Sequence, residues 1–529
     1  MRLIQVKISG YKHLRDVSVS FEKPKESRLF YGSIPIRFFI GLNGSGKSAF
    51  LEGLCFLFSR LVQDEVLGFD FLLIYEIRRN GMLYRVEAAN GTDGEKFKIR
   101  VTSDGETRTF RSFAGRRHLL PDYVLTCASG SNNNFFDIMV RSPRDSLQSD
   151  LFDASLLGKS TQDAQSRRED IEKTLASLRR LDENPICLFI DEQTSVLALA
   201  AFLAVFPEGT EAGRTEAYIK CRQSLLSVPD STPQPVSLSL TLDAKKITEL
   251  DEDAGRYGNL FDDVVSEGEA RAHLNAWNTT RLYQDEVADA ADAHGDVVLT
   301  YLFEPYGAGG GTLCVRSLSQ AFQTPLRFLS KLILARNKGI VKEAHISFRI
   351  RGTDHILEEN ALSEGEYMLL VRLGLLAMGS CGEKDLQCLY LLDEPDVYLN
   401  ERWSVDFVSM IQQMYDGADA FHEIVVATHS SLILTDAFPD QLYYFHLKNG
   451  QVQCHNIRAS TFGGSRNEIM QQLFRTSHPV GSYAYSKIDE LLKTAANTEE
   501  LEELLENVGS GYLRLRLLDK IHRMREDGE

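Results

Sequence analysis

The sequence of 529 residues contains no run of 18 or more apolar residues, so no segment is predicted to cross a membrane as a helix. Its first six residues already have the pattern of a strand and do not resemble a secretory signal. Positive charge is scarce: 58 Lys and Arg stand against 75 Asp and Glu, giving a net charge of −17. This balance argues against a general nucleic-acid coat, because contacts to phosphates need positive potential. With no predicted membrane helix and no secretory signal, we expect a cytoplasmic protein.

Two kinds of charged segment leave weaker alternatives open. Basic groups at 78–79, 96–100 and 116–118 could touch nucleic acid locally, but such groups are more often solvated strand edges. The acidic stretch 285–296, which includes His294, has spacings that could hold a metal ion. No second cluster supports a metal there, so a solvated acidic helix is the favoured interpretation.

Several catalytic signatures are missing from the sequence. The eight cysteines are scattered, without a C-x-x-C pair or a zinc-binding spacing, and are predicted to be reduced thiols. No H-E-x-x-H, no His-Asn nuclease cluster and no Ser-His-Asp arrangement occurs, and no Asp-x-Asp pair follows His429. The sequence therefore indicates no nuclease or protease site of its own.

One segment carries a strong chemical signal. Residues 41–48, Gly-Leu-Asn-Gly-Ser-Gly-Lys-Ser, match the phosphate-binding loop G-x-x-x-x-G-K-[ST] directly after the apolar run 36–40. Glycines let backbone N–H groups surround an anion, Lys47 can reach the outer phosphates, and Ser48 can ligate Mg²⁺. Residues 49–60 are predicted to form a helix whose N-terminus faces the phosphates. The predicted nucleotide-binding residues of this loop are Asn43, Gly44, Ser45, Gly46, Lys47 and Ser48.

A second group of motifs lies far downstream. The apolar run 388–392 ends in Asp393 and Glu394, the placement at which P-loop enzymes hold Mg²⁺ and a general base. We expect Asp393 to serve the metal and Glu394 to polarise the attacking water. Upstream, Leu-Ser-Glu-Gly-Glu at 362–366 precedes an apolar predicted helix, and downstream the short strand 423–427 ends in Thr-His-Ser.

In this order, the four pieces resemble the ABC-type ATPase heads of the SMC-like and RecF-like class. The resemblance implies ATP and Mg²⁺ as cofactors and a pairing of two heads. Ser363 and Gly365 would then cap the γ-phosphate of ATP held by the other protomer, and His429 would sense that phosphate in its own chain. Asp396 falls where the family has a loop that contacts the second protomer.

The fold class implied by the resemblance is α/β: an ABC-type P-loop ATPase head with an accessory antiparallel β-meander, a mostly helical insert and a helical C-terminal tail. The meander is predicted at 71–101, where strand patterns are separated by Asn-Gly turns. The expected divisions are lobe I at 1–140, the insert at 141–325, lobe II at 326–460 and the tail at 461–529.

The insert contains a second acid-ended segment, residues 186–192, which we interpret as a strand that enters a helix rather than as a second metal site. Further strands are predicted at 236–242 and 297–303. No long heptad repeat occurs, which separates this chain from true SMC proteins. The loop that couples ATP to a partner is placed either at 129–132 or at Gln63.

The sequence most resembles the PtuA ATPases of Septu and retron-linked anti-phage systems. The resemblance rests on the compact insert, on the short tail, and on the absence after His429 of the Asp-x-Asp pair that binds metal in the Toprim domains of OLD nucleases. This resemblance implies control of a separate HNH-type nuclease subunit and, in retron settings, association with a reverse transcriptase and its RNA–DNA product. A RecF- or SMC-like repair ATPase and an OLD-like ATP-regulated nuclease stay open as alternatives. Apolar residues at helical spacing in the tail suit packing on another chain or on its own head.

Overall fold

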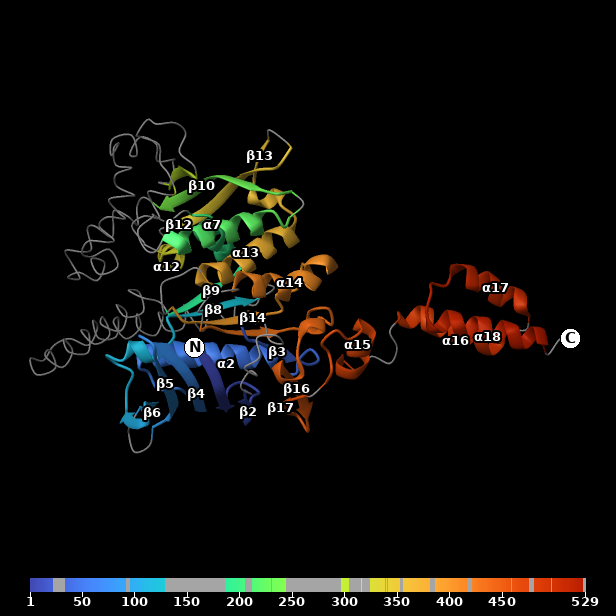
Figure 1. Ribbon diagram of the computed structural model, residues 1–529, viewed down its shortest axis with the longest axis horizontal. Helices are drawn as coiled ribbons and strands as arrows, with labels where there is room; N and C mark the ends of the chain where they lie inside the picture. Colours follow the sequence, from blue (N-terminus) through green and yellow to red (C-terminus); the bar gives the residue numbers. More distant parts are fainter. Residues whose placement is uncertain are drawn as a thin grey trace, which may run out of the picture.

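The computed structural model describes most of lobe I, lobe II and the tail, together with parts of the insert. The described residues are 1–21, 34–91, 96–128, 186–204, 212–229, 231–243, 296–303, 315, 324–337, 339, 341–352, 355–380, 386–415, 421–457, 459–474, 480–495 and 497–526. Figure 1 shows a layered body from which a small helical unit projects. None of the described helices combines the length and apolar character that a membrane crossing needs.

A seven-stranded sheet forms the centre of the body, in the order β17-β16-β3-β15-β14-β8-β9. All its strands run parallel except β17, which forms an antiparallel hairpin with β16. Strands β3, β14 and β15 are buried on both faces, which explains their continuous apolar sequences. The bounds are β3 Ile36–Ile40, β8 Tyr123–Ala128, β9 Cys187–Ile190, β14 Cys388–Asp393, β15 Glu423–Ala427, β16 Leu442–Lys448 and β17 Gln451–Asn456.

The first of the described helices, α2 (Lys47–Gln63), lies between this sheet and a six-stranded antiparallel sheet of order β2-β1-β4-β5-β6-β7 (Figure 1). Residues of both sheets and of α2 share one apolar core. The predicted meander is present as β4, β5 and β6, and β7 adds a fourth strand that the sequence analysis did not predict. The bounds are β1 Arg2–Ser9, β2 Val17–Ser20, β4 Asp70–Arg79, β5 Met82–Asn90, β6 Phe97–Ser103 and β7 Glu106–Phe110.

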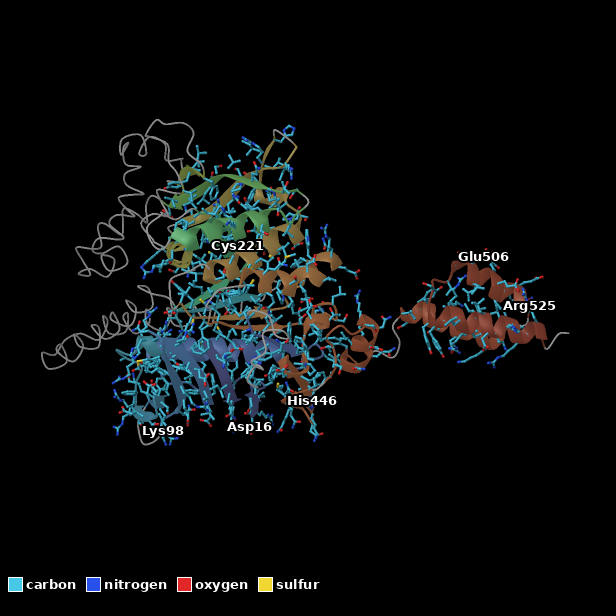
Figure 2. All side chains as sticks on the ribbon, in the orientation of Figure 1. Asp16, Lys98, Cys221, His446, Glu506 and Arg525 are labelled. Carbon is cyan, nitrogen blue, oxygen red and sulfur yellow. The ribbon has the colours of Figure 1, made fainter. Side chains whose placement is uncertain are left out.

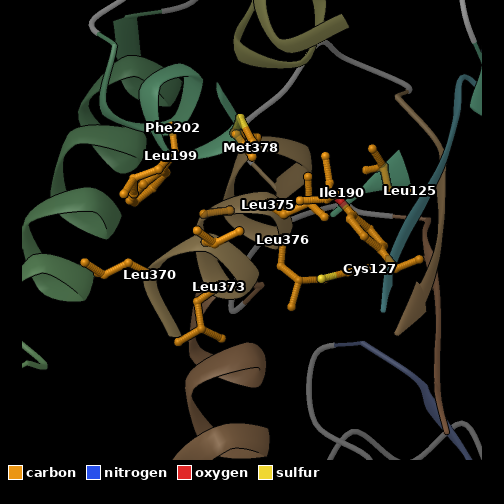
Figure 3. Packing of buried hydrophobic residues seen from close by; sticks show 14 of the residues in the cluster. Leu125, Cys127, Ile190, Leu199, Phe202, Leu370, Leu373, Leu375, Leu376 and Met378 are labelled. Atoms are coloured by element: carbon orange, nitrogen blue, oxygen red, sulfur yellow. The ribbon is translucent and has the colours of Figure 1, made fainter. Parts of the chain in front are cut away.

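Helices from lobe II and from the insert cover the opposite face of the central sheet. Here α13 (Glu364–Ser380) packs against α6 (Glu192–Leu203), and apolar residues of both helices share one core with Leu125, Cys127 and Ile190 of the sheet (Figure 3). The two helices approach closely, since a Cβ atom at Gly374 would meet Cγ of Phe202 at 2.8 Å. Also on this side lie α7 Ala212–Leu226, α12 Pro325–Asn337 and α14 Glu401–Met414.

A four-stranded antiparallel sheet, β11-β10-β12-β13, lies beyond these helices. Two of its strands, β10 (Gln234–Asp243) and β11 (Asp296–Leu302), match the strands predicted in the insert. The other two are β12 (Val341–Arg349) and β13 (Ile356–Glu358). The described parts of the insert thus contain two helices and three strands.

The C-terminal tail is helical, as predicted. Helix α15 (Arg466–Phe474) packs on the body, whereas α16 (Ser482–Thr494), α17 (Thr498–Asn507) and α18 (Tyr512–Glu526) form a unit with its own apolar core. This unit stands apart from the body (Figure 1), and its charged side chains point outward (Figure 2). The structure therefore confirms the predicted α/β fold class, including the accessory meander and the tail.

Candidate active site

The loop after β3 has a backbone shape that requires its glycines. Gly41, Gly44 and Gly46 all have positive φ angles, of 147°, 75° and 102°. A Cβ atom at Gly41 would lie 2.2 Å from the carbonyl oxygen of Phe445, and one at Gly46 would lie 2.8 Å from Val452. Residues 42–44 are exposed at the rim of the loop, while residues 45–47 are buried beneath it. The loop therefore has the tight, glycine-dependent backbone that a phosphate-binding loop at the start of α2 needs.

Lys47 lies at the centre of the loop. Its Nζ donates hydrogen bonds to the carbonyl oxygens of Gly41 at 2.9 Å and Leu42 at 3.4 Å. Burial lowers the pKa of Lys47, and the nearby carboxylates of Glu394 and Asp393 oppose that shift. The ammonium group is therefore held near both acids predicted for the site.

Asp393 ends β14 and is paired in register with Ala427 of β15 and Ala128 of β8. The Ser48 hydroxyl lies close enough to this carboxylate to act on its pKa. Burial raises the pKa of Asp393 to about 6, although the nearby Ser48 hydroxyl and the charge of Lys47 both act to lower it. Its buried Oδ1 atom has no hydrogen-bond partner within the described residues. A carboxylate and a hydroxyl at one point are hard oxygen ligands that suit Mg²⁺.

Glu394 follows directly, in a strained backbone conformation. Its φ angle is 50°, in the left-handed region that non-glycine residues rarely occupy, and its N–H donates to the Ala427 carbonyl at 2.7 Å. Such strain is typical of functional positions. The Glu394 side chain is 31% exposed, and its Oε1 lies 3.1 Å from Nδ1 of His429. The predicted general base and the predicted phosphate sensor are therefore in contact.

The strand order explains how these residues meet. Strand β15, which ends before Thr428 and His429, lies between β3 and β14. Parallel strands present their carboxyl ends at one edge of a sheet, so the loops after β3, β14 and β15 converge there. The sequence motifs predicted the residues of the site but not the order of the strands that carry them.

Asp396 forms a hydrogen bond within its own chain. The Thr428 hydroxyl donates to Asp396 Oδ1 at 2.7 Å, which ties the turn after β14 to the end of β15. Asp396 is only half-buried, so this bond leaves part of it accessible to a second protomer.

Arg372 is a functional candidate that the sequence motifs missed. It lies on α13 with 1% of its surface exposed, and it donates to the carbonyl oxygens of Pro395 and Val397. These contacts fix the turn that carries Glu394. The available signal was a single charged residue inside the apolar stretch 367–378, which is uncommon without a buried partner.

Ser363 and Gly365 lie at the start of α13. Ser363 and Glu366 form a reciprocal capping box, in which Ser363 Oγ accepts from Glu366 N at 3.3 Å and Glu366 Oε2 accepts from Ser363 N at 3.0 Å. A Cβ atom at Gly365 would lie 2.6 Å from the carbonyl oxygen of Tyr398, so this position needs glycine. Among the described residues, no hydrogen bond joins Ser363 or Gly365 to the loop at 41–48.

The second acid-ended segment has a local structural role. Strand β9 lies at the edge of the sheet, and Asp191 caps α6 by accepting from Thr194 N at 2.8 Å. This agrees with a strand that enters a helix. The described residues contain no group of three or more metal-ligating side chains, and residues 285–295 lie outside them.

Other candidates from the sequence are also accounted for. Gln63, a candidate for the coupling loop, is buried at the end of α2 and donates to Ser59 Oγ at 3.2 Å, while residues 129–132 lie outside the described part of the chain.

Two arginines of the basic groups have partners in their own chain. Arg79 donates to the His118 and Leu120 carbonyls and to Asp122, and the Arg116 guanidinium stacks on Phe110. These arginines stabilise the accessory sheet.

No family model matches the sequence, and no curated protein does. Among solved structures, the chain is similar to the SMC head domain from Thermotoga maritima, with 11% identity, a TM-score of 0.32, and coverage of 87% of this chain and 100% of that one. It is also similar to the Pyrococcus furiosus Smc head bound to the C-terminal domain of ScpA, with 12% identity, a TM-score of 0.31, and coverage of 86% and 96%. A third similar structure, an SmcHead bound to the C-winged helix domain of ScpA, has 10% identity, a TM-score of 0.29, and coverage of 87% and 98%.

Proposed function

We propose that this chain is an ABC-type ATPase subunit that binds and hydrolyses ATP with Mg²⁺. The observation that carries the proposal is the convergence of Lys47, Ser48 and Asp393, with Glu394 beside them, at one edge of the parallel sheet. A phosphate cradle alone would suit many anions. A hydroxyl–carboxylate pair for a metal and an accessible carboxylate next to it suit hydrolysis of a nucleotide.

Each residue has a defined role in this proposal. The backbone N–H groups of residues 43–48 would bind the phosphates, and Lys47 would contact the outer ones. Ser48 and Asp393 would hold Mg²⁺, which neutralises phosphate charge when bound. Glu394 would accept a proton from the attacking water, and His429, in contact with Oε1, would orient that carboxylate.

We further propose that the complete site forms between two copies. Gly365 packs against the turn after Glu394, and the capping box places Ser363 at the exposed N-terminus of α13. Ser363 and Gly365 would close on ATP held by the loop of the other copy, with Asp396 near the contact. We also propose that the chain is divided into lobe I (1–140), the insert (141–325), lobe II (326–460) and the tail (461–529).

At the biological level, we propose a role in anti-phage defence, as in PtuA-like systems. ATP would control a separate HNH-type nuclease, with a reverse transcriptase and its RNA–DNA product as possible further components. The support is the motif set together with the tail unit, which has its own core and stands apart from the body. A nuclease encoded next to this chain would support this role over one in DNA repair.

The central experiment measures ATP binding and phosphate release by the purified chain and by Lys47→Ala. We expect the variant to bind ATP at least about tenfold more weakly, because a charge-assisted contact to phosphate is lost. Lys98→Ala is the matched control, since Lys98 is an exposed lysine of β6 on the accessory sheet (Figure 2). Equal ATP binding by Lys47→Ala and Lys98→Ala would refute the proposal.

A further inference from the structure

A residue of the insert contacts the start of α13. Ser231, between α7 and β10, donates to Glu366 Oε1 through its hydroxyl at 2.7 Å and through its backbone N–H at 3.3 Å. The other oxygen of the same carboxylate, Oε2, accepts from the hydroxyl of Ser363 at 2.9 Å and from its N–H at 3.0 Å. One carboxylate therefore joins the insert to Ser363 through four hydrogen bonds.

The capping box explains only half of this arrangement. A Ser-x-x-Glu pair at a helix start stabilises the helix within its own chain segment. It does not need a third residue from a segment more than 130 positions away. The bonds to Ser231 thus require an explanation beyond helix capping.

The backbone beside Ser231 is strained. Thr232 has a φ angle of 37°, which is a rare conformation for a β-branched residue, and its buried Oγ1 has no partner within the described residues. The segment is held by the bond from Arg351 N to the Ser231 carbonyl and by the bond from Thr232 N to the Pro229 carbonyl. Strain of this kind persists only where surrounding contacts fix it, and it is concentrated at functional positions.

A second contact links the insert to the same helix. The Ser195 hydroxyl of α6 lies 2.8 Å from the Tyr367 hydroxyl, one residue after Glu366.

Burial raises the pKa of Glu366, but the hydrogen bonds from Ser231 and Ser363 outweigh this effect and lower the pKa overall. Glu366 is thus held as a carboxylate that accepts all four bonds at neutral pH.

We propose that Ser231 is a positioning residue through which the insert controls Ser363, and that Glu366 transmits this control. The inference rests on the proposed function, because Ser363 acts there on ATP held by a second copy. When Ser231 is in place, the carboxylate and the first turn of α13 are fixed, and Ser363 is presented in one orientation. Loss of the bonds from Ser231 loosens that turn and weakens ATP-dependent pairing.

The test uses full-length Ser231→Ala in a Glu394→Gln background, in which ATP persists. This variant loses one hydroxyl bond and keeps the backbone donor, so it should fold. Ser227→Ala is the control, since the Ser227 hydroxyl of the same insert donates only to the local Ser224 carbonyl. Ser231→Thr, which retains a hydroxyl, should restore the behaviour of the parent chain.

We expect Ser231→Ala to show faster hydrogen exchange at residues 363–367 and about fivefold weaker ATP-dependent pairing by analytical ultracentrifugation. Unchanged exchange, or faster exchange with unchanged pairing, overturns the role of Ser231. If the parent chain binds no ATP or does not pair with it, the proposed function itself fails. These outcomes are distinguishable because the parent chain reports on the function and the difference between Ser231→Ala and Ser227→Ala reports on the inference.

Discussion

Nδ1 of His429 lies 3.1 Å from Oε1 of Glu394, and the two residues follow different strands of the central sheet. The N–H of Glu394 also donates to Ala427, the last residue of the strand before His429. The backbone and the side chain of Glu394 are therefore both fixed by β15. A displacement of β15 would move the proposed base and its imidazole partner together.

Glu394→Gln tests the proposed base. The amide retains the size and part of the hydrogen bonding of the carboxylate but cannot take a proton from water. We expect ATP affinity close to that of the parent chain and hydrolysis slower by at least about 100-fold. Nucleotide binding by calorimetry and phosphate release measure the two quantities, and undiminished phosphate release would exclude Glu394 as the base.

Mixing two inactive variants tests whether the site is shared. Lys47→Ala removes the phosphate contact of one copy, and Ser363→Arg blocks the capping surface of the other. Each variant alone should hydrolyse ATP poorly, whereas a mixed pair contains one composite site that carries neither change. We expect partial recovery of ATPase activity on mixing, and none between two separately tagged preparations of Lys47→Ala. Absence of recovery in pairs shown to be mixed would argue against a shared site.

The pKa of Asp393 predicts a pH dependence of stability. Burial raises this pKa from 3.8 to about 6, so the folded state holds a proton that the unfolded state releases between these pH values. The stability of the protein without metal or nucleotide should therefore fall as pH rises through that window. The penalty reaches up to about 3 kcal/mol above pH 6, at 1.36 kcal/mol per pKa unit.

Asp393→Asn removes this penalty, because the amide is neutral at every pH. In urea unfolding, the variant should exceed the parent chain in stability at pH 7.5, with little difference at pH 4. The variant should also lose the gain in stability that Mg²⁺ and ATP give the parent chain. Equal differences at both pH values would contradict the assigned pKa shift.

Arg372→Met tests the turn behind the base. The substitution leaves the buried carbonyl oxygens of Pro395 and Val397 without their donor, which should cost about 2–4 kcal/mol of unfolding free energy. Hydrolysis should fall more than ATP affinity, because the turn carries Glu394 and not the phosphate loop. Arg466→Met is the control, since Arg466 forms an exposed ion pair with Glu401 and should change stability by less than about 1 kcal/mol.

Removal of residues 475–529 tests the role of the tail unit. Its core is formed by residues of α16, α17 and α18 alone, so the body should keep its melting temperature and its ATPase activity. If the unit docks a separate nuclease, that nuclease should no longer copurify with the truncated chain. Copurification of the truncated chain with the product of the adjacent gene would place the contact elsewhere.

The sequence predicted the phosphate loop and the two acids because their chemistry depends on local spacing. Glycines at 41, 44 and 46 and the acids after an apolar strand are visible without a fold. The insertion of β15 between β3 and β14 was not visible, since strand order follows from packing of distant segments. The partners of Arg372 and Glu366 were missed for the same reason: they come from backbone oxygens and from a serine far away in the chain.

The insert contributes β9 to the central sheet and α6 to the core that also contains α13 (Figure 3). Excising residues 141–325 would leave β8 as a bare sheet edge and would uncover the face of α13 around Gly374. A chain in which residue 140 is joined directly to residue 326 should therefore lose stability, because it lacks β9 and α6. Any shortened version of the protein must retain residues 186–204 or replace them with a segment of the same shape.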